Sequence, residues 1–258
     1  MLKAERQAMI VDAMRERRFM TVQQIIDLTG TSLATVCRDL LELADAHRLR
    51  RVRGGAEFIQ DGTMEMMRQL TGTPFASSRQ IRRDEKQRIA AAAVDMLKDG
   101  ETVIVDGGST TFEMVRPLLS RRLNVITNSL AVAETLYKNS SNRVTVPGGE
   151  IFPEQHIILN PFEDRIFKDY FADRVFMGAQ GVGPEGVTNS DSLLIRTQQA
   201  MLDCGGEIVL LVDSSKFGRH GKLRLCGLER IDVVITDAKV SADMVKMMRD
   251  ADIKVIKV

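Results

Sequence analysis

The sequence predicts an α/β protein in which an N-terminal winged helix-turn-helix domain precedes a larger α/β domain with a mostly parallel sheet. Near the N-terminus, two short amphipathic stretches flank a glycine-containing turn, and two short strand-like runs follow around a glycine pair. From residue 84 onward, short apolar runs alternate with helical stretches, the pattern of a parallel sheet covered on both faces. The charge is also divided: residues 1–56 carry ten basic and seven acidic residues, a net of +3, and the remainder carries −2.

The helix-turn-helix is indicated by apolar spacing and by cap residues. Apolar residues at helical intervals predict a first helix over residues 4–17. Thr21 is a suitable N-cap for a second helix, which ends before Gly30, where a turn needs a left-handed residue. Ser32 can cap a third helix that runs to Ala46 and turns Leu41 inward with its other leucines.

A hairpin wing follows the third helix. Gly54 and Gly55 separate Arg48–Arg53, which holds four arginines and no acid, from Ala56–Ile59. In a winged module the third helix enters the major groove and the wing lies along the backbone or minor groove, so we expect double-stranded operator DNA as a partner. The other interpretation is a small helical bundle that mediates protein contacts. The candidate DNA-binding residues are Ser32, Thr35, Cys37, Arg38, Arg48, Arg50, Arg51 and Arg53.

The winged domain is expected over residues 1–59, a linker without hydrophobic period over 60–83, and the larger domain over 84–258. The expected strands of the larger domain are Thr102–Val105, Leu123–Thr127, Arg143–Val146, Arg174–Met177, Ile208–Val212, Val233–Thr236 and Ile253–Val258. The expected helices are Asp84–Leu97, Thr110–Leu119, Leu130–Leu136, Leu193–Leu202 and Ala242–Arg249.

Five strand ends of the larger domain carry Gly, Ser, Thr and Asn, and ligands of parallel sheets bind at that edge. Glycines and hydroxyls after the first strand can approach an anion, and Lys216 adds a cation. We therefore expect a phosphorylated sugar or polyol as the effector. The candidate effector-binding residues are Asp106, Gly107, Gly108, Ser109, Thr110, Thr111, Asn128, Ser129, Gly148, Gly149, Asp213 and Lys216.

Several classes of site lack their sequence signature. The three cysteines are widely spaced with no Cys-x-x-Cys pair, so neither a disulfide framework nor a metal site is expected, and a reducing cytoplasm is the expected location. The first strand-end loop lacks the P-loop lysine and the Gly-x-Gly-x-x-Gly spacing, so no nucleotide cofactor is expected. No apolar run approaches the roughly 18 residues of a membrane span, so no membrane partner is expected.

Two sets of motifs resemble the DeoR family of bacterial transcriptional regulators. The first is Ser32…Thr35-Val36-Cys37-Arg38-Asp39-Leu40 with Arg53-Gly54-Gly55-Ala56, although the family usually has arginine where Cys37 stands. The second is Asp106-x-Gly-Ser-Thr-Thr111, Ile126-Thr-Asn-Ser-Leu130 and Asp213-Ser-Ser-Lys-Phe-Gly218, which resembles the family's effector domain, itself similar to ribose-5-phosphate isomerase-like folds.

The resemblance implies a DNA-binding repressor of a carbohydrate-utilisation operon that works as a homodimer or homotetramer and senses a phosphorylated sugar. Within the family, Phe19–Val22 and Arg51–Glu57 are most similar to the ascorbate-utilisation branch, which makes ascorbate 6-phosphate one candidate effector. The resemblance leaves the operator sequence and the direction of the effector response open. It also implies that the chain is not an enzyme and has no catalytic residues.

Two other functions remain open at this point. A sugar-phosphate isomerase with an appended DNA-binding domain would need a general base, for which Asp106 or Glu150 could serve. Against it, none of the three histidines follows directly on an expected strand. A nucleotide-dependent binding module is the third interpretation.

Overall fold

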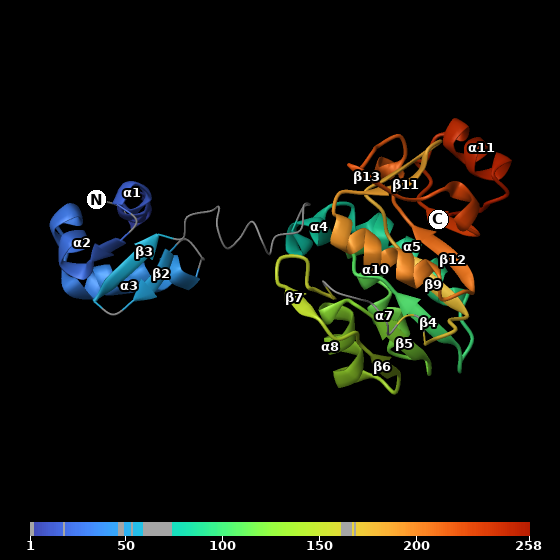
Figure 1. Ribbon diagram of the computed structural model, residues 1–258, viewed down its shortest axis with the longest axis horizontal. Coiled ribbons are helices and arrows are strands. Elements are labelled where there is room, and N and C mark those ends of the chain that lie inside the picture. Colours follow the sequence, from blue (N-terminus) through green and yellow to red (C-terminus); the bar gives the residue numbers. More distant parts are fainter. Residues whose placement is uncertain are drawn as a thin grey trace. The chain divides into compact units, whose positions relative to one another are not determined.

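The computed structural model describes residues 3–17, 19–45, 49–52, 54–58, 74–160, 167 and 169–258. The chain divides into two compact units, Met1–Arg68 and Gln69–Val258, which are treated separately below (Figure 1). The first unit is a winged helix-turn-helix and the second an α/β unit around a parallel sheet, so the predicted fold class is confirmed.

The N-terminal unit holds three helices and a small antiparallel sheet. The helices are α1 (Lys3–Arg17), α2 (Val22–Thr29) and α3 (Leu33–Asp45). The strands are β1 (Phe19–Thr21), β2 (Leu49–Val52) and β3 (Gly55–Phe58), in the order β1-β3-β2. Strand β1 was not predicted, because a run of three residues is too short to show a period.

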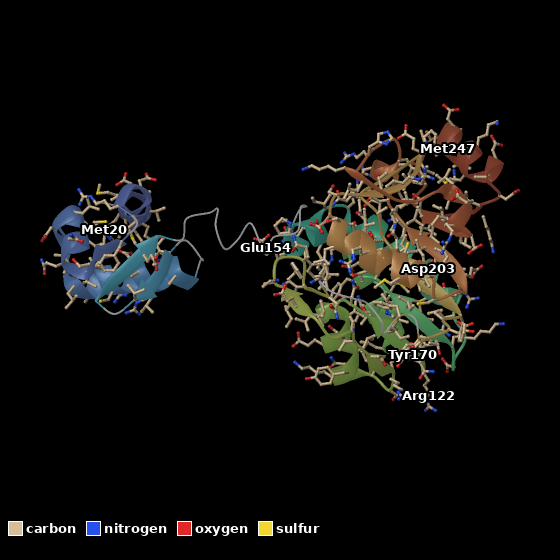
Figure 2. All side chains as sticks on the ribbon, viewed as in Figure 1. Met20, Arg122, Glu154, Tyr170, Asp203 and Met247 are labelled. Atoms are coloured by element: carbon tan, nitrogen blue, oxygen red, sulfur yellow. The ribbon has the colours of Figure 1, made fainter. Side chains whose placement is uncertain are left out.

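The predicted caps and turn are present. The Thr21 hydroxyl accepts from the backbone of Gln24 at 3.2 Å, and the Gln24 side chain accepts from the backbone of Thr21 at 2.9 Å, which completes a capping box at the start of α2. Gly30 has a φ of 63° and its N–H donates to Ile26 at 2.8 Å. Beneath α2 and α3 the core is formed by buried residues that include Met20, labelled in Figure 2.

The larger unit contains a seven-stranded sheet in the order β15-β14-β12-β9-β4-β5-β6. All of its neighbouring strands run parallel. Its strands are β4 (Thr102–Val105), β5 (Asn124–Thr127), β6 (Arg143–Thr145), β9 (Arg174–Met177), β12 (Glu207–Leu211), β14 (Val233–Thr236) and β15 (Lys254–Lys257). Each overlaps an expected strand.

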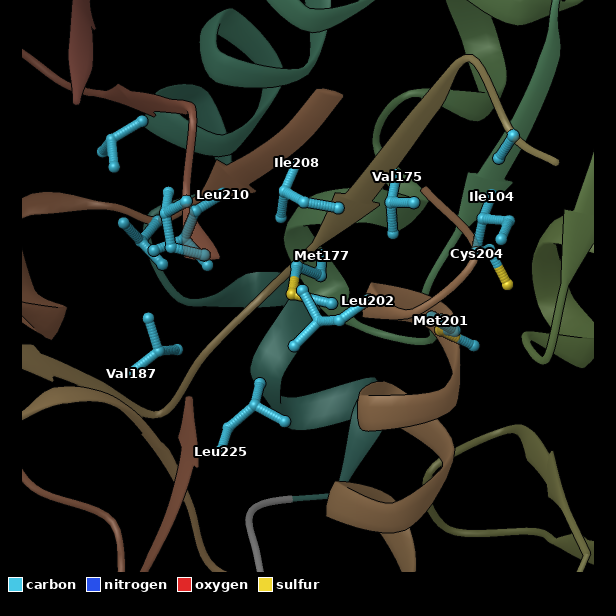
Figure 3. Close-up of a cluster of buried hydrophobic side chains, with 14 of the residues drawn as sticks. Ile104, Val175, Met177, Val187, Met201, Leu202, Cys204, Ile208, Leu210 and Leu225 are labelled. Carbon is cyan, nitrogen blue, oxygen red and sulfur yellow. The ribbon is translucent and has the colours of Figure 1, made fainter. Parts of the chain in front are cut away.

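Helices cover both faces of this sheet. They are α4 (Phe75–Gln80), α5 (Arg83–Asp95), α6 (Ser109–Phe112), α7 (Val115–Leu118), α8 (Leu130–Asn139), α10 (Ser192–Leu202) and α11 (Ala242–Asp250), with 3₁₀ turns η1 (Ser214–Lys216) and η2 (Leu228–Arg230). Figure 3 shows Val175 and Ile208 of neighbouring strands on the side of Leu202 in α10. Phe176 and Val209, one residue further along, belong to the separate cluster that contains most of the buried apolar residues of α5 and α8.

Two small antiparallel sheets stand outside the main one. One has the order β10-β11-β13, and the other is the hairpin β7-β8. Their strands are β7 (Glu150–Phe152), β8 (Ile157–Leu159), β10 (Gly181–Gly183), β11 (Gly186–Asn189) and β13 (Leu223–Cys226). None of these strands was predicted.

Four details differ from the sequence-based expectations. The stretch Thr110–Leu119 forms α6 and α7 in place of one helix. Helix α5 starts at Arg83, one residue before the expected start at Asp84, and follows Arg82, whose φ is 52°. Residues 74–83 lie in the range assigned to the linker, yet they include α4. Leu41 is 47% exposed, on the outer side of α3.

Candidate functional site

The outer face of α3 carries the residues expected to contact DNA. Ser32 and Arg38 are exposed, and Thr35 and Cys37 are half-buried. The hydroxyls of Ser32 and Thr35 lie 3.0 Å apart, within hydrogen-bond distance of each other. The Thr35 backbone N–H also points at the Ser32 hydroxyl, at 3.4 Å. The start of α3 therefore places two hydroxyls side by side, with the Arg38 guanidinium further along the helix.

The wing is tied to the helices by its turn. Gly54 has a φ of 86°, and its carbonyl accepts from the backbone of Val22 at 3.0 Å. Gly55 has no room for a side chain, because a Cβ there would meet the backbone of Met20. Arg51 is exposed on β2. Of the other wing arginines, Arg48 and Arg53 lie outside the described residues, as does the side chain of Arg50.

Helix α3 is fixed to α1 by a buried carboxylate. Asp39 accepts from Nε of Arg6 at 2.5 Å and from the Gln7 amide at 3.2 Å. Burial works against the charge of Asp39, but the hydrogen bonds from Arg6 and Gln7 and the nearby cations outweigh it, so its pKa lies below the ordinary value of 3.8. Asp39 therefore positions the helix and does not face outward with Arg38.

A cavity of about 390 Å³ lies in the α/β unit, at the carboxyl ends of strands β4, β9 and β12. Six of the expected effector residues line it, and it lies at the edge where ligands of parallel sheets bind. They are Asp106, Gly107, Gly108, Ser109, Thr110 and Lys216.

The other six expected residues are not among those that line the cavity, and several of them shape its walls. Asn128 accepts from the backbone of Gly107 at 2.7 Å, and Thr111 donates to the carbonyl of Gly108 at 3.0 Å. Ser129 caps α8. Asp213 accepts from the backbone of Ser215 at 2.9 Å.

The remaining pair of this group, Gly148 and Gly149, lies directly before β7. A Cβ on Gly149 would meet the carbonyl of Leu159 in the opposite strand, whereas a Cβ on Gly148 would meet nothing within 4 Å. Gly149 thus permits the close approach of two strands.

Asp106 is the most buried ionisable group of the cavity wall. One of its oxygens, Oδ2, accepts from the Gln198 amide at 2.6 Å, and Oδ1 has no hydrogen-bond partner within the described part of the chain. Burial raises the pKa of Asp106 to about 6, against the opposing effect of Gln198 and the neighbouring amides. A carboxyl with such a pKa can exchange a proton near neutral pH.

The candidate effector residues predicted from the sequence leave out much of the cavity wall, including several polar residues. Asn189 and Gln198 come from β11 and α10, and Arg219 and His220 from the loop after η1. Gln198 is only 1% exposed. A polar residue at an inward-facing position of a helix was the one feature of the sequence that could have indicated its place in the cavity wall. His220 lines the cavity although it does not follow directly on an expected strand.

A buried lysine supports the glycine-rich loop. Lys86 of α5 is 4% exposed and donates to the Ser109 hydroxyl at 2.9 Å and to the Ser78 carbonyl at 2.5 Å. Burial lowers the pKa of Lys86. No pattern of spacing in the sequence singles this residue out.

Helix α4 closes part of the cavity, because Phe75 and Ser78 both line it. The Phe75 ring stacks on His156 at 5.2 Å and meets Phe112 edge-on at 5.4 Å. Its N–H donates at 2.8 Å to the carbonyl of Glu154, which Figure 2 labels. The helix is therefore held by contacts that come from several elements around the cavity.

Among the described residues, no group of three or more His, Cys, Asp or Glu side chains could hold a metal ion. The cysteines Cys37, Cys204 and Cys226 are unpaired. No helix in the described ranges is both long enough and apolar enough to span a bilayer.

Comparison with known families gives two matches along the chain. Residues 6–61 match the model of the DeoR-like helix-turn-helix domain, and residues 81–238 match that of the DeoR C-terminal sensor domain.

Relatives that match over their whole length are named as transcriptional regulators. The chain is 30% identical over 260 residues to the HTH-type transcriptional regulator UlaR of Shigella flexneri serotype 5b (strain 8401), and the match covers 100% of both chains. The HTH-type transcriptional regulator UlaR of Escherichia coli strain K12 / DH10B is also 30% identical over 260 residues, again across 100% of both chains.

Solved structures resemble part of the chain. Ribose 5-phosphate isomerase A from Methanocaldococcus jannaschii has 19% identity and a TM-score of 0.37, over 52% of this chain and 54% of that one. The eIF2B beta chain from Chaetomium thermophilum has 18% identity and a TM-score of 0.43, over 59% of this chain and 48% of that one.

Proposed function

The chain belongs to the DeoR family of transcriptional regulators, and we propose that it represses a carbohydrate-utilisation operon and responds to a phosphorylated sugar or sugar derivative. The observation that carries the proposal is the cavity at the carboxyl edge of the parallel sheet, whose wall includes Ser109, Lys216 and Arg219, in a chain that also has a winged helix-turn-helix. The proposed state is a cytoplasmic homodimer or homotetramer, because paired recognition helices read paired half-sites on DNA. In this proposal the protein has no catalytic role.

The DNA-binding half of the proposal assigns a role to each part of the winged unit. The exposed guanidinium of Arg38 can bond bidentately to guanine in the major groove, and the hydroxyls of Ser32 and Thr35 can bond phosphates. The half-buried Cys37 precedes Arg38 in α3 and offers a thiol. The exposed Arg51 belongs to a basic wing that also includes Arg48, Arg50 and Arg53, suited to the phosphate backbone.

The effector half of the proposal assigns the cavity to an anion that also bears hydroxyls. Lys216, Arg219 and His220 supply cationic or donor groups to the cavity wall. The hydroxyl of Ser109 and the close-packed backbone of Gly107 and Gly108 lie on the same wall. These groups suit a phosphate.

Helix α4 is the part of the cavity wall that is nearest in sequence to the N-terminal unit. It begins at Phe75, after its N-cap residue Pro74, and two of its residues line the cavity. A bound effector would therefore contact the start of the sensor unit. It can change DNA binding only through unequal affinity for the DNA-bound and free states of the protein.

The test is a fluorescence-anisotropy titration of the full chain against DNA from upstream of its own operon. Titrations are repeated with ribose 5-phosphate, glucose 6-phosphate, ascorbate 6-phosphate and inorganic phosphate. We expect sequence-preferring binding that weakens with salt, and one sugar phosphate that shifts it more than inorganic phosphate does. Binding without sequence preference, or the absence of any sugar phosphate that binds or shifts it, contradicts the proposal.

One observation favours a second candidate function. Asp106 lines the cavity, and a pKa of about 6 suits a general base at neutral pH, as an aldose–ketose isomerase requires. The other candidate base, Glu150, is exposed on β7 and is not among the residues that line the cavity. Turnover of ribose 5-phosphate that disappears in Asp106→Asn would establish this second function, and the absence of turnover would exclude it for that substrate.

A further inference from the structure

We propose that Asp106 determines which effectors the cavity accepts, by requiring a hydroxyl hydrogen at its free oxygen, and that Asn189 and Gln198 fix this requirement. The inference rests on the proposed function, because it takes the cavity of the sensor unit as the effector site. Beyond the position of the effector, it predicts one chemical group, a hydroxyl, that the effector must carry.

The three side chains form a buried chain of hydrogen bonds. The Asn189 amide nitrogen donates to Oε1 of Gln198 at 2.6 Å, and Nε2 of Gln198 donates to Oδ2 of Asp106 at 2.6 Å. The residues are 3%, 1% and 1% exposed, respectively. Hydrogen bonds of this length in a buried site hold their partners in one orientation.

The direction of the chain follows from the chemistry of an amide. An amide has a carbonyl end that accepts and an amino end that donates. Because Asn189 occupies the carbonyl end of Gln198, the amino end must face Asp106. Oδ2 of Asp106 is therefore confined to the role of acceptor.

The second oxygen of Asp106 is left without a donor. The Gly107 N–H, which is the nearest backbone donor in sequence, is used by Asn128 at 2.7 Å. The amides of Gly107, Asn128 and Gly178 lie close enough to favour the charged form of Asp106. None of them makes a hydrogen bond to Oδ1, and within the described part of the chain the Asn128 amino group also has no hydrogen-bond partner. A buried acceptor without a donor is costly, and a ligand that supplies the donor removes that cost.

A sugar hydroxyl can supply the donor, and a carbonyl oxygen, a hydrogen or a fluorine cannot. An analogue that lacks the contacting hydroxyl leaves Oδ1 buried and unpaired, which is the situation in which binding sites discriminate most strongly. We therefore expect one hydroxyl position of the effector at which removal costs tenfold or more in affinity, since hydrogen bonds to charged groups are the strong ones.

Replacing Asp106 by asparagine should reverse this preference. The amino end of Gln198 still needs an acceptor, so the asparagine carbonyl takes the place of Oδ2 and its amino group takes the place of Oδ1. The cavity then presents a donor where the wild-type protein presents an acceptor. Gln198→Met removes the orienting bond and should reduce discrimination without reversing it.

The experiment uses isothermal titration of the full chain with whichever of ribose 5-phosphate, glucose 6-phosphate and ascorbate 6-phosphate binds best. Its monodeoxy and monodeoxyfluoro derivatives are then titrated against wild type, Asp106→Asn and Gln198→Met. Ser192→Ala, at an exposed position at the start of α10, is the matched control. Circular dichroism and unchanged DNA affinity verify that each variant is folded.

The expected result is one position at which the deoxy and deoxyfluoro compounds lose tenfold or more with wild type and Ser192→Ala. At that position alone the loss should shrink in Gln198→Met and disappear or reverse in Asp106→Asn. Equal losses at every position in wild type and Asp106→Asn overturn this inference and leave the proposed function intact. No binding of any of the three sugar phosphates contradicts the proposed effector class, and this inference with it.

Discussion

Arg6 and Asp39 form an ion pair that joins the first helix of the N-terminal unit to the helix expected to read DNA. The Nε–Oδ2 distance is 2.5 Å, and the two side chains are 12% and 2% exposed. The pair spans 33 residues of sequence, so it fixes the relation of α1 to α3 in the folded state. The same carboxylate forms part of the motif that resembles the family, and its contacts give that motif a structural explanation.

Asp39→Asn should destabilise the N-terminal unit by about 2 kcal/mol at pH 7, because the variant loses charged hydrogen bonds in a buried position. Since the pKa of Asp39 is lowered on folding, its stabilising effect is present above the ordinary value of 3.8 and is lost as the pH falls through the lower, folded value. Hydrogen exchange of the amides of α1 and α3 in the full chain measures this. The exposed Asp27→Asn is the control, and a difference that stayed constant down to pH 3 would contradict the assignment.

Arg38→Ala and Arg51→Ala should weaken DNA binding in different ways. Loss of a bidentate base contact by Arg38 should cost about 1–3 kcal/mol and relax the preference at one base pair. Loss of a phosphate contact by Arg51 should weaken binding to all sequences and reduce the salt slope by about 1. Anisotropy titrations at several salt concentrations separate the two effects, with Arg122→Ala, labelled in Figure 2, as an exposed control on the sensor unit. Identical effects of the two variants would refute this division of roles.

Lys216→Ala should leave DNA affinity unchanged and abolish the response to the effector, because the cavity loses a cation that can meet the anionic group. The affinity for the effector should fall about tenfold or more. The comparison variant is Lys222→Ala, an exposed lysine six residues further along that is not among those lining the cavity. If Lys216→Ala instead abolished DNA binding, the assignment of this lysine to the effector site would be incorrect.

Asp106→Asn, the variant expected to lose or reverse the hydroxyl preference of the cavity, should also stabilise the unliganded chain at neutral pH. Folding raises the pKa of Asp106 from 3.8 to about 6. The contribution of Asp106 to the free energy of unfolding is therefore fully present below pH 3.8 and is lost as the pH rises through about 6. The shift corresponds to a cost of about 3 kcal/mol for ionising this carboxyl in the folded state, and the neutral asparagine avoids that cost. Denaturation of the sensor unit in the full chain, measured from pH 4 to pH 8, should give a flatter profile for the variant than for the exposed control Asp169→Asn.

Gly148→Ala and Gly149→Ala test two neighbouring glycines that differ only in what a Cβ would meet. At Gly149 the Cβ would meet the backbone of Leu159, which cannot move without disturbing β8, so we expect a loss of about 2 kcal/mol in the free energy of unfolding. At Gly148 the space is open, so the effect should be close to zero. Equal thermal stability of the two variants would argue against the close approach of β7 and β8.

The main sheet could be predicted because its strands are buried on both faces and appear as short apolar runs, such as Thr102–Val105. The hairpins could not, because strands such as Gly181–Gly183 are three residues long and contain glycines that the sequence pattern assigns to loops. Leu41 was assigned to the core from its helical spacing alone, and the structure places it on the outer face of α3.

The cavity was predictable only where it is made from strand ends. The stretch from Asp106 to Thr110 follows β4 directly, and Lys216 lies in the loop after β12, so the rule about carboxyl edges finds them. Gln198 comes from a helix and Asn189 from a hairpin, and each reaches the cavity through packing between distant segments. Such contacts leave no local signal in the chain.

The position of Lys86 has a consequence for how two parts of the cavity wall move. Its ammonium has three donors, and two of them are used by the Ser78 carbonyl of α4 and by the Ser109 hydroxyl. Ser78 and Ser109 both line the cavity, so one buried cation joins wall segments that lie 31 residues apart in the sequence. Separating the two segments would leave a buried ammonium short of an acceptor, which is costly, so α4 and the glycine-rich loop keep one mutual position.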